Sequence, residues 1–171
     1  MKKVSSTPWT AEPDRFADLT PSDLNSTEKE TLISKALWML ADRHRRGCTL
    51  RDPDGTRAYL RLKCADYRSE VFGCIFLDSR HRVLDHAELF QGTVDAAVVY
   101  PRVVVQRALE VNAAALVFYH NHPAGIAEPS QADRALTRRL IDALALVDIR
   151  TVDHLVVAGI DSVSFAERGW L

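Results

Sequence analysis

The sequence contains little cysteine, no excess of charge of either sign and no long apolar run. Its three cysteines, at positions 48, 64 and 74, form no Cys-x-x-Cys pair, which argues against a disulfide framework and against an all-thiolate zinc site. Cys74 stands inside the apolar run 71–77, where a free thiol usually packs as a small hydrophobic group. We therefore expect no catalytic cysteine.

The near-balance of charge excludes one class of function as the main one. The formal net charge is −1, which argues against a domain built chiefly to bind nucleic-acid phosphates. No apolar stretch has the length of a membrane span. Residues 1–8 also lack the apolar core of a secretory signal. We expect a cytoplasmic protein with no membrane partner.

The N-terminal third of the chain predicts an arm followed by a helix and a linker. Residues 1–26 mix Ser, Thr, Pro and charge without periodicity, which is typical of a flexible or irregular arm. Residues 27–54 are assigned to an N-terminal helix and linker. In that segment Thr27 and Glu30 resemble a capping box. Gly47 predicts the stop of the helix.

The rest of the chain alternates between helical and strand patterns. Asp52 to Gly55 predicts a turn, and a short helix is expected to follow it. Apolar runs and periodicity then predict strands over 71–77, 83–90, 113–119, 151–158 and 163–165, with helices that start at Pro101 and at residue 131. This alternation predicts an α/β layered domain with a mixed sheet.

The most informative stretch is His120-Asn121-His122, followed by Ser130 and Asp133. Residues two apart on an extended segment project to the same face, so both imidazoles are expected to point to one place beyond the strand. An aspartate in the first turn of the next helix would face back toward it. Two histidines and one carboxylate suit zinc better than magnesium or calcium. Three protein ligands with an open fourth position predict a hydrolytic zinc site.

Ser130 and Asp133 also permit a simpler interpretation. A serine followed three residues later by an acid is a plausible helix-capping pair, with the acid near the positive end of the helix. On that interpretation the two residues need no metal. It leaves unexplained why two histidines at strand spacing stand immediately upstream.

The same stretch resembles the motif of a known family. His-x-His, seven residues, Ser, two residues and Asp is similar to the signature of the JAMM (MPN⁺, or JAB) zinc metalloproteases. The surrounding "HNHPAG…EPSQAD" resembles their RadC-like bacterial branch. The similarity extends, in order, to "IFLDSRHRV", "FQGTVDAAVVYPRVVVQRALEVNAAAL", "VDHLVVAG" and "SFAERG". The domain that it implies covers residues 55–171.

The resemblance implies a fold and a ligand set. The fold is a three-layer α/β/α domain with a mixed central sheet, of JAB/MPN-like and cytidine-deaminase-like architecture. Carried over by position, His120, His122 and Asp133 are the ligands of one Zn²⁺ per chain. Ser130 is a hydrogen-bond donor to the developing oxyanion. Glu70 is the general base.

The sequence holds further candidate residues around the motif. Glu88 and Glu110 are alternatives to Glu70, and we expect both on solvated faces. Asn121 points away from its histidine neighbours and is expected only to order the loop. Asp153 and His154 also match the family, either as support for the ligands or as a structural pair.

The implied function is a zinc-dependent hydrolase, a metallopeptidase or isopeptidase acting on an unknown peptide or protein substrate. The alternative is a non-catalytic MPN-type binding module in DNA metabolism or mobile-element biology. RadC-like proteins commonly carry an N-terminal DNA-binding domain, whereas this sequence shows only the helix over 28–46 there, so DNA association has little support. A zinc deaminase would need His-x-Glu and Pro-Cys-x-x-Cys, and neither occurs. A nuclease stays an alternative, although the sequence lacks the acidic cluster that is usual for two-metal phosphoryl chemistry.

Overall fold

The computed structural model describes residues 19–43, 47, 49–50, 52–92 and 99–171. Most of the predicted arm over 1–26 lies outside these residues; its last part holds a short 3-10 turn, Pro21–Asp23. In the described part of the chain, no helix has both the length and the apolar character needed to cross a membrane.

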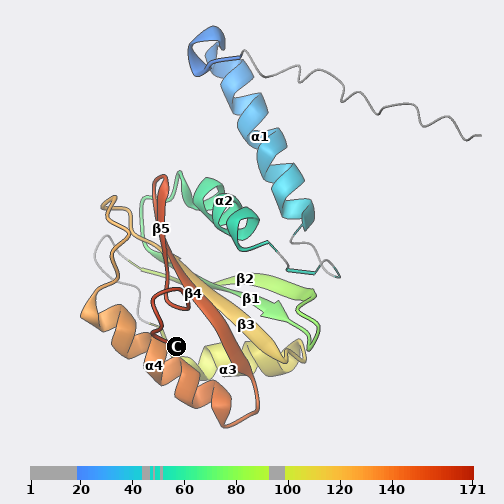
Figure 1. Ribbon diagram of the computed structural model, residues 1–171, viewed down its shortest axis with the longest axis vertical. Helices are drawn as coiled ribbons and strands as arrows, with labels where there is room; N and C mark the ends of the chain where they lie inside the picture. Colours follow the sequence, from blue (N-terminus) through green and yellow to red (C-terminus); the bar gives the residue numbers. More distant parts are fainter. Residues whose placement is uncertain (1–18, 44–46, 48, 51, 93–98) are drawn as a thin grey trace, which may run out of the picture.

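A five-stranded mixed sheet forms the middle of the molecule (Figure 1). The strands lie in the order β2-β1-β3-β4-β5, and only the β3–β4 pair is parallel. Their bounds are β1 Val71–Leu77, β2 Val83–Gln91, β3 Ala115–Asn121, β4 Arg150–Ala158 and β5 Asp161–Ser164. The predicted α/β class and mixed sheet are confirmed.

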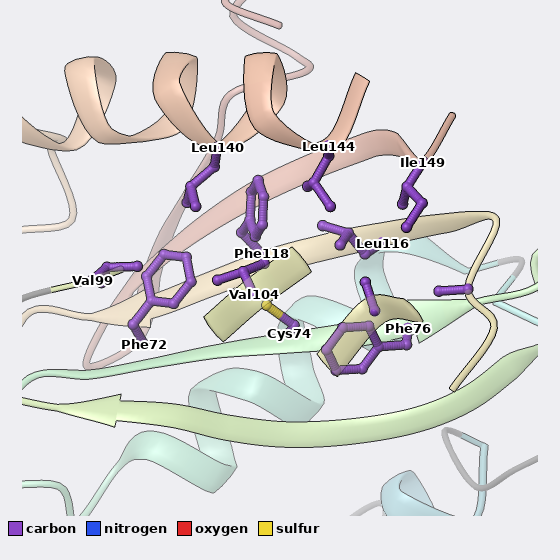
Figure 2. Close-up of a cluster of buried hydrophobic side chains, with 12 residues drawn as sticks. Phe72, Cys74, Phe76, Val99, Val104, Leu116, Phe118, Leu140, Leu144 and Ile149 are labelled. Carbon is purple, nitrogen blue, oxygen red and sulfur yellow. The ribbon is translucent and has the colours of Figure 1, made fainter. Parts of the chain in front are cut away.

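Helices cover both faces of this sheet. On one face α3 (Pro101–Glu110) and α4 (Gln131–Ala145) pack over alternate strand residues, including Phe72, Phe76 and Phe118 (Figure 2). On the other face α2 (Pro53–Cys64) packs through Tyr59, Leu60 and Cys64 against the remaining strand residues. Because β1 and β3 are buried on both faces, all their residues are buried, which explains their continuous apolar runs. The predicted three-layer arrangement is confirmed.

Two helix starts differ from the sequence prediction. Helix α1 (Ser26–Arg43) is capped by Asn25, whose Oδ1 accepts from the Glu28 N–H at 3.0 Å while the Glu28 carboxylate accepts from the Asn25 N–H at 2.9 Å. The predicted capping box at Thr27 and Glu30 is therefore wrong by two residues. The predicted turn at Asp52 to Gly55 is also wrong, because Pro53 occupies the first helical position of α2, where its fixed φ and missing N–H favour a helix start.

Strand β3 begins and ends two residues later than predicted, so it carries the first histidine. It continues past Tyr119 through Asn121 and pairs with β1, with Phe72 opposite His120. Gly73 lies opposite Tyr119, and a Cβ at position 73 would overlap the Tyr119 ring. The Tyr119 hydroxyl is hydrogen-bonded to His86 Nε2 at 2.8 Å, which fixes the ring over the glycine.

Replacing Gly73 by alanine should therefore destabilise the fold. We expect Gly73→Ala to lower the free energy of unfolding by about 1–3 kcal/mol, the usual cost of overpacking a core, in urea denaturation. In a Tyr119→Ala background the same change should cost clearly less, because the overlapping ring is gone. An equal cost in both backgrounds would contradict this account of the glycine.

Candidate metal centre

The two histidines of the motif are held by the end of β3. His120 is a buried residue of the strand, and its ring stacks on Phe72 with the centroids 6.4 Å apart. His122 directly follows the strand, and its backbone N–H donates to the Val157 carbonyl of β4 at 2.8 Å. Strand geometry thus directs both imidazoles to one side of the sheet end, as the spacing predicts.

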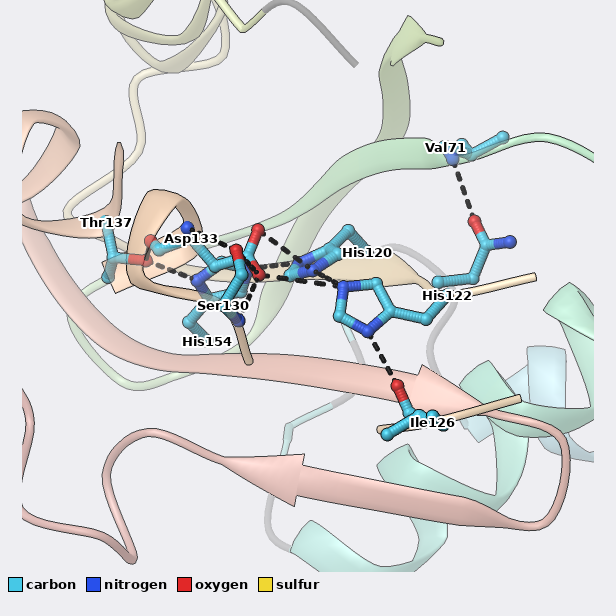
Figure 3. Close-up of polar contacts among 9 residues, drawn as sticks. Val71, His120, His122, Ile126, Ser130, Asp133, Thr137 and His154 are labelled. Atoms are coloured by element: carbon cyan, nitrogen blue, oxygen red, sulfur yellow. Dashed lines mark hydrogen bonds and ion pairs between the residues drawn. The ribbon is translucent and has the colours of Figure 1, made fainter. Parts of the chain in front are cut away.

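Asp133 reaches the same place from the first turn of α4. One ligand atom from each of His120, His122 and Asp133 lies within 4.8 Å of the other two. The His120 and His122 Nε2 atoms are 2.9 Å apart, and the Asp133 oxygens lie 3.4 Å from His120 Nε2 and 3.6 Å from His122 Nε2 (Figure 3). The structure brings together all three predicted metal ligands.

These spacings match those expected of zinc ligands. With bonds of about 2.05 Å and tetrahedral angles, ligand atoms are about 3.3 Å apart. The three observed separations, 2.9, 3.4 and 3.6 Å, lie around that value. The 3.4 and 3.6 Å distances end on different oxygens of Asp133, so the three side chains are spaced as zinc ligands are without defining one exact tetrahedral face.

A buried chain of hydrogen bonds fixes the tautomer of His120. The Thr137 hydroxyl donates to the Asp133 carbonyl at 2.6 Å, so its oxygen must accept from His154 Nδ1, also at 2.6 Å. His154 Nε2 is then an acceptor, and it lies 2.8 Å from His120 Nδ1. His120 must donate from Nδ1, which leaves a lone pair on Nε2. That lone pair faces the centre.

The neutral His122 ring carries its proton on the same nitrogen as His120, Nδ1. Its Nδ1 lies 2.7 Å from the Ile126 carbonyl, which can only accept, so Nδ1 carries the proton. Two Nε2 lone pairs and a carboxylate then face one another. Such an arrangement of three acceptors requires a cation between them, a metal ion or a proton.

The protonation preferences agree with this requirement. Burial lowers the pKa of His120 to about 4, and burial also holds the pKa of His154 well below its usual value, so both rings are neutral. Although burial opposes it, hydrogen bonding from His122 and from Ser130 holds the pKa of Asp133 far below its usual value. The hydrogen bond to Asp133 in turn raises the pKa of His122. A proton on His122 and a metal ion are thus alternative cations at this centre.

Ser130 and Asp133 also form the capping pair that the sequence permits. Ser130 is the N-cap of α4; its hydroxyl accepts from the Asp133 N–H at 3.1 Å, and it donates to Asp133 Oδ2 at 2.6 Å. The Ser130 N–H donates to the same oxygen at 2.7 Å. The cap uses Oδ2, which also lies 3.6 Å from His122 Nε2, while Oδ1 faces His120. One carboxylate serves both arrangements, so they are not exclusive.

Glu70 stands immediately before β1, which begins at Val71. Phe72 pairs with His120, and continuing the antiparallel register by two residues brings Glu70 opposite His122. The Glu70 carboxylate is near enough for its charge to contribute to the raised pKa of His122. The rivals lie elsewhere: Glu88 binds Lys63 and Tyr67, and Glu110 binds side chains of its own helix α3.

Asn121 has a larger part than expected. Its side chain accepts from the Val71 N–H at 2.8 Å and donates to the Ser69 carbonyl at 3.1 Å. These bonds hold the residues on both sides of Glu70. Asn121 therefore orders the start of β1, and not only its own loop.

Asp153 and His154 have different roles. His154 supports His120, as described above, whereas Asp153 accepts hydrogen bonds from the N–H groups of His154 and Ala166 and from the Ser164 hydroxyl. Asp153 is thus structural. Thr137 was missed by the sequence analysis; the available signal was its place one helical turn after Asp133.

The surrounding sequence matches a known family. The sequence model of the RadC-like JAB domain matches residues 50–170 of this chain. The chain belongs to the RadC-like JAB domain family. A UPF0758 protein of Vibrio cholerae is 57% identical over 140 residues, which cover 82% of this chain and 88% of that protein. UPF0758 protein Tgr7_0100 of Thioalkalivibrio sulfidiphilus is 62% identical over 126 residues, 74% of this chain and 56% of that protein. The RadC-like match therefore includes the whole motif.

The hydrogen-bond chain behind His120 can be tested by removing one hydroxyl. Thr137→Val keeps the side-chain shape but leaves the buried His154 Nδ1–H without its acceptor. We expect the free energy of unfolding to fall by about 1–3 kcal/mol, measured by urea denaturation. Thr151→Val is the matched control, because the Thr151 hydroxyl is buried without a hydrogen-bond partner and its loss should be nearly neutral. Equal costs would refute the assigned chain.

The two roles of the Ser130–Asp133 pair can be separated by two substitutions. Asp133→Asn keeps an acceptor for the cap but removes the charge, so zinc affinity should fall at least roughly tenfold. Ser130→Ala should cost about 1 kcal/mol of stability and leave about one zinc per chain. Elemental analysis, chelator competition and thermal unfolding measure these outcomes. Full zinc retention in Asp133→Asn would mean that the carboxylate only caps the helix.

Proposed function

We propose that this protein is a zinc-dependent hydrolase that cleaves peptide or isopeptide bonds. The observation that carries the proposal is the convergence of two histidine lone pairs and one ionised carboxylate, with no donor among them. His120, His122 and Asp133 would hold one Zn²⁺. Membership of the RadC-like JAB domain family supports this function.

The ligand set leaves room for chemistry as well as binding. Three protein ligands are the number found in catalytic zinc sites, whereas structural sites usually have four. Zinc held there would act as a Lewis acid on a carbonyl and lower the pKa of water toward ~7. The buried, neutral imidazoles of His120 and His154 keep this side of the centre free of competing positive charge.

Glu70 is the proposed general base. A carboxylate opposite His122 in register would be able to take a proton from the attacking water and deliver it to the leaving amine. The hydrogen bonds of Asn121 to Ser69 and Val71 support this proposal, because they hold the backbone on both sides of Glu70. General base catalysis needs such a fixed placement.

Ser130 is proposed as an oxyanion donor, as the family motif implies. In this structure its hydroxyl donates to Asp133 Oδ2. Donation to an oxyanion would require rotation of the hydroxyl about the Cβ–Oγ bond, with the Ser130 N–H keeping its own bond to Asp133. A donor of this kind contributes on the order of 3 kcal/mol to transition-state stabilisation.

The function is tested with zinc-loaded protein and a quenched-fluorescence peptide library together with lysine-linked isopeptides. We expect cleavage that is lost on chelation and restored by zinc. Glu70→Gln should retain zinc but lose activity by about 100-fold or more. Glu110→Gln, which alters an exposed rival on α3, should be unchanged.

Two other results would contradict parts of this proposal. Full activity in Glu70→Gln would remove this residue as the base. No cleavage by protein that holds zinc would favour the alternative, a non-catalytic binding module of the MPN type.

A further inference from the structure

A small cavity lies beside the candidate metal centre and shares His122 with it. It has a volume of about 170 Å³ and lies between the end of α2, the loop after β3 and the β4–β5 turn. Its walls include Arg61, Cys64, Tyr67, Asn121 and Gly159. Sites for drug-sized ligands start at about 300 Å³, so this space fits a single side chain or a chain terminus.

Arg61 is the charged residue of this cavity, and its donors are not all used. Its Nη1 donates to the Ile160 carbonyl of the β4–β5 turn at 2.9 Å, whereas its Nε is buried without a hydrogen-bond partner. No carboxylate of the described residues forms an ion pair with it within 4 Å, although its helix neighbours Arg57 and Lys63 both have one. A partly buried guanidinium without an anion is costly unless a ligand supplies one.

The other polar groups of the cavity do not offer chemistry of their own. Burial raises the pKa of the Cys64 thiol to about 12, so this cysteine is not a nucleophile. The Tyr67 hydroxyl is occupied by Glu88, and the Asn121 side chain is occupied by the start of β1. The guanidinium is therefore the group that selects the occupant.

We infer that this cavity is a specificity pocket in which Arg61 binds a carboxylate of the substrate close to the bond that is cleaved. Calling the bound molecule a substrate rests on the proposed function, whereas the binding of a carboxylate by Arg61 does not. Because Nε is enclosed by protein atoms, the carboxylate would meet the Nη edge of the planar guanidinium, which the Ile160 carbonyl holds in place through Nη1. The carboxylate belongs either to an acidic side chain or to a free C-terminus.

The pocket is tested by binding, independently of hydrolysis. Full-length ¹⁵N-labelled protein, stripped of metal so that no carboxylate binds zinc, is titrated by NMR with three probes. N-acetyl-glutamate amide carries only a side-chain carboxylate, N-acetyl-glutamine only a terminal one, and N-acetyl-glutamine amide neither. We expect one or both acids to shift the Arg61 Nε–H and Gly159 signals and the neutral probe to leave them unchanged; which acid binds identifies the source of the carboxylate.

Variants assign the binding to Arg61. Arg61→Gln should weaken binding of the acidic probe by at least roughly tenfold. The affinity of Arg61→Lys should lie between those of the wild type and Arg61→Gln, because lysine keeps the charge but loses the planar fork. Arg102→Gln, an exposed arginine on α3, is the matched control. Should Arg61→Gln fail to fold, Ala65→Trp, at an exposed position on the cavity wall, blocks the pocket with Arg61 intact.

Equal binding of the neutral probe, unchanged affinity in both Arg61→Gln and Ala65→Trp, or no shift with any probe would overturn the inference. None of these results depends on zinc or on cleavage. The proposed hydrolase can therefore fail while the carboxylate pocket stands, and the pocket can fail while the hydrolase stands.

Discussion

The candidate centre depends on one buried chain of hydrogen bonds, from the Asp133 carbonyl through Thr137 and His154 to His120. Because the Thr137 hydroxyl must donate to the Asp133 carbonyl, the donor and the acceptor in every later hydrogen bond of the chain are determined. The result is that His120 presents an unprotonated nitrogen. Because the chain joins α4 to β4 and β3, it also ties the helix layer to the sheet at the point where the ligands meet.

The alternation of strand β3 gives three consecutive residues three different functions. Tyr119 points to the α2 face and packs over Gly73. His120 points to the α4 face and to the ligand group. Asn121 turns back to the α2 side and holds the residues around Glu70. The period of two of a strand thus separates a packing residue, a residue of the candidate metal centre and a residue that orders the start of β1 within one short segment.

The sequence predicted those parts of the fold and site that depend on local pattern. The apolar run 71–77 identified a strand buried on both faces, and the spacing of His120 and His122 identified their common direction. The start of α1 was missed because Asn25…Glu28 and Thr27…Glu30 are overlapping capping patterns, and local sequence does not rank them. Thr137 and Thr151 likewise look alike in sequence. Only the packing of α4 on β4 decides which hydroxyl finds a partner.

The capping bonds of Asp133 bear on how relatives of this chain should be compared. An aspartate at this position has two independent reasons to persist, since it would be retained for the helix start even in a protein that had lost its metal. His120 also has a structural use, because its Nδ1–H satisfies the buried His154 Nε2. His122 has less, since apart from the ligand group its ring only donates to the Ile126 carbonyl in the loop after β3. His122, and not the aspartate, is therefore the position whose loss would best mark a relative that no longer holds the proposed metal.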